Sequence, residues 1–479
     1  MKRRIELPDV DQVQLPHIFG LRPGVLILVI LLVVLVAAIF FIAFFPGIIK
    51  GGRYVTFRGQ LSESGVQVDG TYLGATDYQF FIGSGSHEVQ LMKAGIPYAS
   101  YTLEVDHPVF LTWLFHRKQE VAAPPLQLDE TTKESIIHFN LQEVADASAI
   151  LHYDAVTRYR PVFANLVQDL RAMDKENSAA IDLALRYITN ESMLEDAKMA
   201  LQTISPTEAQ KQLLGLAEEI IHKPGEMTYT PEKAVPVMQE QRRQLSLGSF
   251  ELTGFAYEAA SFSIGRQSEG RYPEVKEAPS TVQTPPFVLG SGEITQYQWA
   301  LFLEENPSWD VAHKANLIEE GLVDESYLDG MTISSVFVTS KPVFNVSYYA
   351  AQAFCEWASR KSGKEVFLPT EAMWTLASSQ ESNTAYASSL SPSPDTNNNP
   401  VSLLGGVWEI TQTPYIPLSR ISGYEQSLAL HQKFSLPPDP IVKGGSYLND
   451  PQAITAHTVG VIAPNACGDQ IGFRVAWYD

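Results

Sequence analysis

A long uncharged apolar segment near the N-terminus constrains the fold of this chain more than any other feature. From Val25 to Phe45, 21 consecutive residues carry neither a charge nor a strongly polar group. A helix of this length crosses the hydrocarbon layer of a bilayer, which is roughly 30 Å thick. A buried core helix would show a polar face, and a signal peptide would end in small residues at a cleavage site. This segment has no polar face and ends in bulky residues, so it predicts an uncleaved transmembrane helix over residues 24–48.

Basic residues are distributed unequally about this segment. Those before it are Lys2, Arg3, Arg4 and Arg22, and those after it are Lys50, Arg53 and Arg58. The more basic flank of a membrane span stays in the cytoplasm. We therefore expect residues 1–23 to be cytoplasmic and the bulk of the chain to be extracytoplasmic, in the periplasm or at the cell surface.

Charge and cysteine content exclude several classes of protein. The 479 residues exceed what one ordinary core accommodates, and their formal net charge is -20. A surface this acidic repels phosphate backbones, which argues against a nucleic-acid partner. The chain has two cysteines, Cys355 and Cys467, which excludes a disulfide-rich scaffold and a zinc site built from several thiolates.

Short strands are predicted over residues 51–122. This segment is rich in β-branched and aromatic residues, alternates polar with apolar positions, and is interrupted by glycines. The order VQVDGTYLG, GSGSHEVQLMKAGIPY and YTLEV resembles the PEGA domain, a small surface-exposed β module. The same pattern fits other small β-sandwiches, and both interpretations stay open.

Helical periodicity dominates residues 138–224. One apolar helix face consists of Phe163, Leu166, Val167, Leu170 and Met173, and a second of Ile181, Ala184, Leu185 and Ile188. A further helix is expected to start with Ser205 as its cap and Pro206 at its first position, and to stop at Pro224. The segment predicts a small bundle or an array of helical hairpins.

Residues 250–479 carry an ordered set of motifs: FSIG at 262–265, GEITQYQWALFL at 292–303, a block from Lys341 to Ser378, GGVWEI at 405–410, KGGSY at 443–447 and IGFRVA at 471–476. In this order they resemble the formylglycine-generating-enzyme, or sulfatase-modifying-factor, family, whose fold is similar to that of C-type lectins. In the central block, Ser347 is expected to cap a helix that Gly363 ends. The expected architecture is multidomain α+β, with a membrane helix, a β domain, a helical domain and this C-terminal domain.

The resemblance also identifies what this chain lacks. In the active family, two cysteines just after the G-G-S-(Y/F) motif bind copper(I), and with oxygen they oxidise a sulfatase cysteine to formylglycine. The matching positions here are Asn449 and Ile454. Neither side chain replaces the soft thiolates that copper(I) requires. We therefore assign no catalytic or cofactor-binding residue and expect a pseudoenzyme. Cys355 is expected to be buried in a helix and Cys467 to lie in a loop, and whether the two form a disulfide is left open.

The two glutamates of the central motifs have competing interpretations. Glu371 and Glu409 suggest a paired acid–base site, but structural carboxylates that cap backbone amides are the preferred interpretation. The family resemblance adds a third role, since members often hold a structural calcium near the G-N-(V/A)-W-E turn. The matching ligands are Glu409, the carbonyls of Gly405 and Val407, and Ser402, where the family has an asparagine.

Two functions remain after these arguments. The first is a membrane-anchored binding or scaffold protein that engages a protein or glycan ligand outside the cytoplasm. The second is a divergent sulfatase-modifying-type oxidoreductase that acts on an unknown protein substrate. Loss of both thiolates favours the first, although a fold alone does not establish a function.

Overall fold

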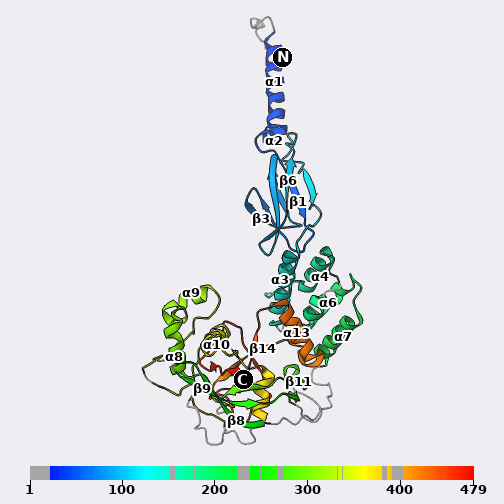
Figure 1. Ribbon diagram of the computed structural model, residues 1–479. Helices are drawn as coiled ribbons and strands as arrows, with labels where there is room; N and C mark the ends of the chain where they lie inside the picture. Colours follow the sequence, from blue (N-terminus) through cyan, green and yellow to red (C-terminus); the bar gives the residue numbers. More distant parts are fainter. Residues whose placement is uncertain are drawn as a thin grey trace, which may run out of the picture. The chain divides into compact units, whose positions relative to one another are not determined.

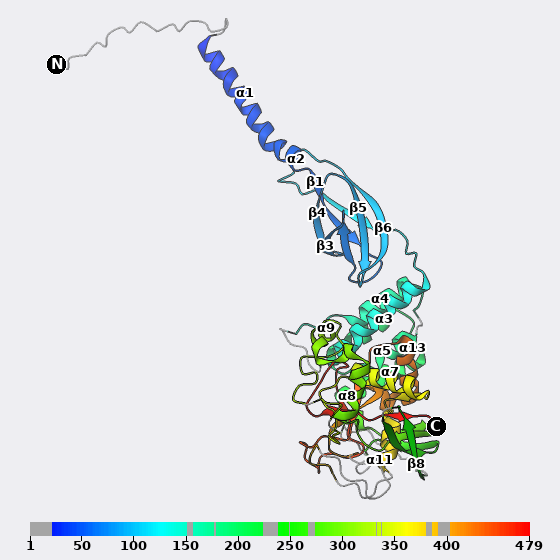
Figure 2. The ribbon, with the colours of Figure 1, turned by 60° about the vertical axis from the view of Figure 1, so that its left-hand side comes forward.

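The structure is a computed structural model that describes residues 22–150, 157–176, 179–223, 238–248, 250–266, 274–331, 333–336, 338–379, 386–390 and 403–479. Contacts within the chain divide it into two compact units, Met1–Ile136 and Ile137–Asp479. Their helices and strands are labelled in Figures 1 and 2. The division falls inside one helix, α3 (Glu130–Ser148).

The apolar segment forms two consecutive helices, α1 (Pro23–Ala43) and α2 (Phe45–Ile49). By length and composition α1 qualifies to span a membrane, and its apolar side chains are exposed. The expected single helix over 24–48 is interrupted at Phe44 because Pro46 has no N–H to offer the carbonyl of Ile42. Figure 2 shows α1 continuing into α2 and then into β1.

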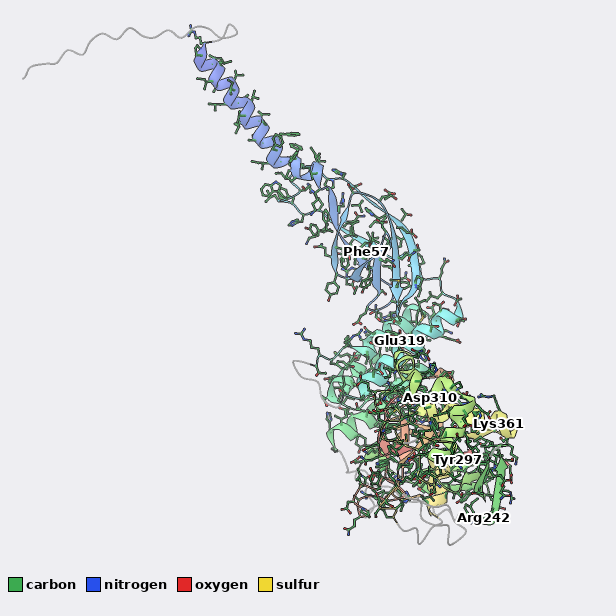
Figure 3. The ribbon with its side chains drawn as sticks, turned by 90° about the vertical axis from the view of Figure 1, so that its left-hand side faces the viewer. Phe57, Arg242, Tyr297, Asp310, Glu319 and Lys361 are labelled. Atoms are coloured by element: carbon green, nitrogen blue, oxygen red, sulfur yellow. The ribbon has the colours of Figure 1, made fainter. Side chains whose placement is uncertain are left out.

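In the described part of the first unit, from residue 22 on, seven strands form two sheets. Their bounds are β1 (Gly52–Arg58), β2 (Gly65–Val68), β3 (Thr71–Ala75), β4 (Gln79–Gly83), β5 (Gly85–Lys93), β6 (Ile96–Val105) and β7 (Lys118–Ala122). One sheet has the order β4-β1-β7, in which β1 is antiparallel to β4 and parallel to β7. The other has the order β3-β2-β5-β6 and is antiparallel throughout. Alternate residues of β1 are buried, among them Phe57, which Figure 3 labels.

Helices begin the second unit. After α3 they are α4 (Val162–Ala172), α5 (Ala179–Leu185), α6 (Glu191–Leu201) and α7 (Glu208–His222). The predicted apolar face of α4 is buried. The start of α7 differs from the prediction, because Thr207 rather than Ser205 caps it. Thr207 and Gln210 bond each other's backbone N–H groups in a capping box, which satisfies two donors at the start of the helix.

The helical segment and the C-terminal segment belong to the same compact unit. The buried Arg186 guanidinium donates through Nε to Ser427 Oγ at 2.9 Å, and Leu418 N donates to Arg186 O at 3.0 Å. These bonds join the end of α5 to α12 (Ser419–Ser422) and α13 (Tyr424–Phe434). The two segments are therefore hydrogen-bonded to each other within one compact unit, and the boundary between residues 138–224 and 250–479 stays a prediction.

The described residues of the second unit form three sheets. The largest has the order β13-β18-β12-β9-β8, with β8 (Met238–Ser246), β9 (Glu251–Tyr257), β12 (Phe287–Gly290), β13 (Val366–Phe367) and β18 (Ala476–Trp477). A second has the order β16-β15-β14-β17, with β14 (Trp408–Pro414), β15 (Pro440–Lys443), β16 (Gly460–Val461) and β17 (Ile471–Gly472). The third pairs β10 (Ala260–Ile264) with β11 (Ser280–Thr284).

Aromatic side chains fill the core beside these sheets. Trp299 of α8 (Gln296–Glu305) stacks on Phe354 of α10 (Tyr348–Ser362), with 5.9 Å between ring centroids. Ser347 caps α10 by accepting a bond from Ala350 N, and Gly363 ends it in the left-handed conformation, both as predicted. The remaining helices are α9 (Lys314–Glu319) and α11 (Glu371–Ser379), with single 3-10 turns at Val275–Glu277, Pro307–Trp309 and Val311–His313.

Candidate functional site

The turn after β15 carries the two positions at which the resemblance implies copper ligands. Gly444 and Gly445 begin it with φ values of 93° and 75°, a region that favours glycine. A Cβ atom on Gly445 would lie 2.8 Å from Ile454 Cγ2 and 3.2 Å from the Tyr386 hydroxyl. Ile454 therefore packs directly on this turn.

Asn449 lies in the turn after β15, and its side chain is hydrogen-bonded within that turn. Its Oδ1 accepts a hydrogen bond from Ser446 N at 2.8 Å, and the Ser446 hydroxyl lies 3.0 Å from the same oxygen. The hydroxyl is also 2.5 Å from Gln470 Oε1, and Tyr386 donates to the Ser446 carbonyl at 2.6 Å. The structure thus brings Asn449 to the buried Ser446 and Ile454 to the adjacent Gly445, so an amide and a hydrocarbon occupy the turn.

The two thiols lie on other elements and are both free. Cys355 is buried within α10, and burial raises the pKa of its thiol far above the usual value. Cys467 is half-buried, and burial raises the pKa of its thiol to about 12. Both groups are therefore protonated at neutral pH, whereas a metal ligand or nucleophile must be a thiolate.

A cavity of about 290 Å³ is lined in part by Gln470, the residue that contacts Ser446 in the turn after β15. All four strands of the β16-β15-β14-β17 sheet contribute to its lining, together with the loop that precedes β17. Trp408 supplies an aromatic ring, and Asp469 and Gln470 supply polar groups. Gly460 leaves room for that ring, because a Cβ atom there would lie 3.2 Å from the Trp408 ring and 2.6 Å from Val442. Gln470 links the cavity to the Ser446 network.

Glu409 is part of a buried ion pair. Arg474 Nη2 and Nε each lie 2.5 Å from one of the two Glu409 oxygens, and Trp374 Nε1 donates to Glu409 Oε2 at 2.8 Å. Burial raises the pKa of Glu409, and the Arg474 charge opposes that rise. The partners of this carboxylate are a guanidinium and an indole, whereas the preferred interpretation had it capping backbone amides.

Glu293, which the sequence reasoning did not select, faces the same pair. Its Oε1 accepts a hydrogen bond from Val407 N at 3.1 Å. A Cβ atom on Gly406 would lie 2.3 Å from that oxygen, so the carboxyl group fits only because residue 406 is glycine. Burial, followed by the charge of Glu409, raises the pKa of Glu293 to about 8.

Glu371 is surrounded by cationic and hydroxyl groups. It bonds Arg420, accepts from the Tyr424 hydroxyl at 2.8 Å, and lies 3.6 Å from Lys443 Nζ, which is too long for a hydrogen bond. Burial alone would raise the pKa of Glu371, but the charges of Arg420 and Lys443 outweigh it and lower the pKa. Burial lowers the pKa of Lys443 to about 8, although Glu371 opposes the change.

The calcium ligands implied by the resemblance are only partly described. Ser402 lies outside the described residues. Gly405 and Val407 lie in the turn that precedes β14. Both Glu409 oxygens are bonded to Arg474. Among the residues that the structure describes, three or more His, Cys, Asp or Glu side chains are nowhere grouped to hold a metal ion. Calcium at this turn stays a prediction.

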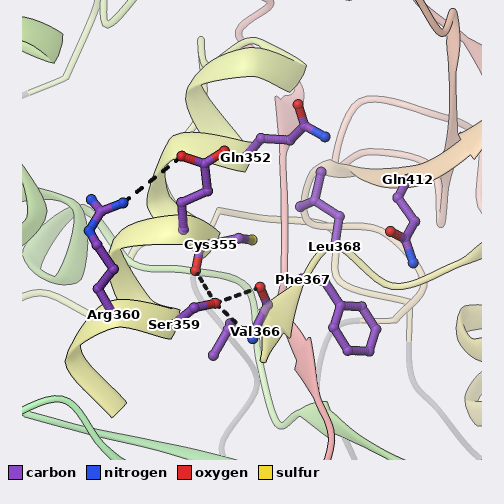
Figure 4. Close-up of a pocket in the computed structure, with 9 residues that line it drawn as sticks. Gln352, Cys355, Ser359, Arg360, Val366, Phe367, Leu368 and Gln412 are labelled. Carbon is purple, nitrogen blue, oxygen red and sulfur yellow. Dashed lines mark hydrogen bonds and ion pairs between the residues drawn. The ribbon is translucent and has the colours of Figure 1, made fainter. Parts of the chain in front are cut away.

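A larger cavity of about 430 Å³ lies along α10 and was not predicted (Figure 4). Cys355, Phe367 and Leu368 provide apolar lining, and Gln352 and Gln412 provide amides. Ser359 accepts from Val366 N at 2.9 Å and donates to Cys355 O at 2.8 Å, which fixes one wall. Of its lining residues, only Cys355 was singled out from the sequence, as a buried residue of a helix.

Comparison with known proteins identifies the domain. Residues 205–402 match the sequence family described as the sulfatase-modifying factor enzyme 1-like domain, so the chain contains a domain of this kind. The match begins just before α7, earlier than residue 250, where the domain was expected to start. An uncharacterized protein of Borreliella burgdorferi is 19% identical over 438 residues, which cover 84% of each chain.

Solved structures resemble the chain over about half its length. Treponema denticola variable protein 1 is 16% identical with a TM-score of 0.35, covering 50% of this chain and 99% of that one. PvdO from Pseudomonas aeruginosa is 16% identical with a TM-score of 0.31, covering 52% and 100%. CarF is 14% identical with a TM-score of 0.32, covering 50% and 100%.

Proposed function

We propose that this chain is a membrane-anchored, extracytoplasmic binding or scaffold protein whose sulfatase-modifying-factor-like domain has lost its chemistry. One observation carries the proposal: an amide at Asn449 and a hydrocarbon at Ile454 occupy the turn where the family resemblance implies two copper-binding thiolates. Copper(I) requires soft ligands, and the Asn449 oxygen is already bonded to Ser446. The raised pKa values of both cysteine thiols give further support.

The ligand that we propose is a protein or a glycan that contacts the Trp408 cavity. An aromatic ring beside an amide and a carboxylate offers an apolar face together with hydrogen-bonding groups. Peptides and sugars both present that combination of surfaces. In this proposal α1 is the uncleaved span, residues 1–23 are cytoplasmic, and the β unit is a PEGA-like spacer.

The chemical part of the proposal is tested on the full-length protein in detergent. Copper(I) is titrated against a competing chelator, and a sulfatase-type cysteine peptide is incubated with copper, oxygen and reductant before mass spectrometry. We expect neither tight copper(I) binding nor aldehyde. The matched variant carries both Asn449→Cys and Ile454→Cys, and we expect it to gain copper(I) affinity. Aldehyde formation by the wild type that is abolished by Cys467→Ala would restore the oxidoreductase.

The binding part is tested on glycan and peptide arrays with the same full-length protein. The Trp408→Ala variant is expected not to bind the arrayed glycans or peptides that the wild type binds, because the substitution removes the aromatic ring from the cavity lining. Met199→Ala is the control, since Met199 is exposed on α6 and does not line the Trp408 cavity. Equal signals from Trp408→Ala and wild type would remove the Trp408 cavity from the proposal.

The orientation is tested with membrane vesicles of known sidedness. We expect externally added protease to digest the C-terminal domain in right-side-out vesicles and to spare it in inside-out vesicles. The opposite pattern would place the domain in the cytoplasm. Release of the protein by alkaline carbonate would show that α1 is not a membrane anchor.

A further inference from the structure

The loop between β6 and β7 exposes a group of large apolar side chains. Phe110, Trp113, Leu114 and Phe115 are each about half exposed, with Trp113 at 52%. Contiguous exposed apolar side chains on a protein surface mark an interaction site. We refer to residues 109–115 as the apolar loop.

The apolar loop is bonded to the end of α1. Pro46 has no N–H and therefore leaves the Ile42 carbonyl without its helical partner, and Trp113 Nε1 donates to that carbonyl at 2.8 Å. Leu111 N donates to the next carbonyl, that of Ala43, at 2.6 Å. The Phe110 ring also packs on Phe44, with centroids 5.2 Å apart. These contacts hold the apolar loop level with the end of the membrane helix.

A cavity of about 340 Å³ lies beside the apolar loop and is lined by cations and aromatic rings. Lys50, His116 and Arg117 provide the basic groups, and Tyr54, Phe81 and Trp113 provide the rings. Lys50 Nζ lies 5.6 Å from the Phe81 ring centroid, and the Tyr54 and His116 rings are 5.1 Å apart. Lys50 and His116 therefore each lie against an aromatic ring of the lining.

These cations lack the carboxylate partners that neighbouring arginines have. Arg53 pairs with Asp106 at 2.6 Å, and Arg58 pairs with Asp77 and Glu120. Within the described part of the chain, no ion pair involves Lys50 or Arg117. An aromatic pocket with two uncompensated cations is complementary to an anion that carries apolar substituents.

We propose that this pocket binds the phosphate group of an anionic phospholipid from the leaflet in which α1 ends. The apolar loop inserts among the acyl chains beside that lipid, and Lys50 and Arg117 bind its headgroup. Two observations identify a lipid as the occupant. Hydrogen bonds to the Ile42 and Ala43 carbonyls attach the apolar loop to the end of α1. Trp113 makes the first of these bonds and also lines the pocket. This inference rests on the proposed membrane anchoring.

The test uses full-length protein in lipid nanodiscs of phosphatidylcholine, alone or mixed with phosphatidylglycerol. The protein is extracted into detergent, and the lipids it retains are counted by native mass spectrometry. We expect the wild type to retain phosphatidylglycerol over phosphatidylcholine by about tenfold, because the choline ammonium offsets the phosphate charge of phosphatidylcholine and would be repelled by Lys50 and Arg117. Arg117→Gln and, independently, Lys50→Gln are expected to abolish that preference.

Lys118→Gln is the matched control, because Lys118 is the next cation in the chain and does not line the pocket. We expect it to keep the wild-type preference. Equal losses in Arg117→Gln and Lys118→Gln would show a general charge effect and overturn the pocket. Thermal stabilisation by inorganic phosphate without any lipid preference would replace the lipid by a free anion and also overturn the proposal.

Alkaline carbonate extraction separates this inference from the anchoring on which it rests. Protein that is extracted by carbonate is not anchored, and both proposals then fail. Protein that resists extraction but retains both lipids equally keeps its anchor and loses only the lipid pocket. Thermal melting of each variant checks that the substitutions leave the fold intact.

Discussion

The Arg474 guanidinium and the Glu409 carboxylate meet edge to edge inside the C-terminal domain, with two N–O distances of 2.5 Å and neither side chain accessible to solvent. Arg474 also donates to the Gly290 carbonyl at 3.1 Å, so it connects β14 with β12. The pair therefore joins the two larger sheets of this domain.

Arg474→Met is expected to destabilise the protein by about 3–5 kcal/mol, because it leaves the buried Glu409 charge without its cation. Arg360→Met is the control, since Arg360 and Glu356 form an exposed pair at 4.0 Å. Thermal melting followed by circular dichroism measures both. Similar melting temperatures for the two variants would contradict a structural role for the buried pair.

Glu293 predicts a pH dependence of stability. The pKa of its carboxyl group is raised by burial from 4.5 to about 8 in the folded chain. Between these values the folded state holds a proton that the unfolded state has released, so the free energy of unfolding falls as pH rises from about 4.5 to about 8. Glu293→Gln removes this titration, and its stability relative to wild type is expected to increase across that window. Glu304→Gln, on an exposed side chain of α8, is expected to keep the wild-type profile.

Arg186 predicts that the helical and C-terminal segments unfold together. Arg186→Met would leave the Ser422 carbonyl and the Gln426 and Ser427 side chains without this donor, at a cost of about 2–4 kcal/mol. Arg171→Met, on an exposed side chain of α4, is the control. In a calorimeter, a fragment of residues 137–479 should show one transition. A fragment of residues 250–479 with the same melting temperature would contradict the coupling.

The start of α7 gives a local test of capping. Thr207→Ala is expected to destabilise the protein by about 1 kcal/mol, because it removes the acceptor for Gln210 N. Ser205→Ala should change little, since Ser205 is not the cap. Chemical denaturation of both variants measures the difference, and a larger loss for Ser205→Ala would place the cap where the sequence suggested.

This capping difference illustrates what the sequence could predict. The periodic faces of α4 and α10, the Ser347 cap and the Gly363 terminus all follow from spacing within a few residues. At α7, Ser205 with Glu208 and Thr207 with Gln210 both have the spacing of a capping box, and the structure forms the second. Local rules locate a helix, and they leave its first residue open when two caps compete.

Long-range partners were beyond such rules. Glu409 and Arg474 are separated by 65 positions, and nothing near Glu409 in the sequence indicates a guanidinium. The raised pKa of Glu293 could not be predicted from the sequence, because Val407 and Glu409 surround its carboxyl group only in the folded chain. Likewise, the Trp113 bond to Ile42 spans 71 positions.

The two cysteines bear on where such a chain is able to mature. Because Cys355 and Cys467 are both free thiols with raised pKa values, no covalent bond between them contributes to stability. A reductant therefore breaks no cross-link in the folded state, and assembly of the chain needs no thiol oxidase or disulfide isomerase. A cysteine introduced at an exposed position would react far faster than either native thiol, so a single fluorescent or cross-linking probe could be attached without first deleting them.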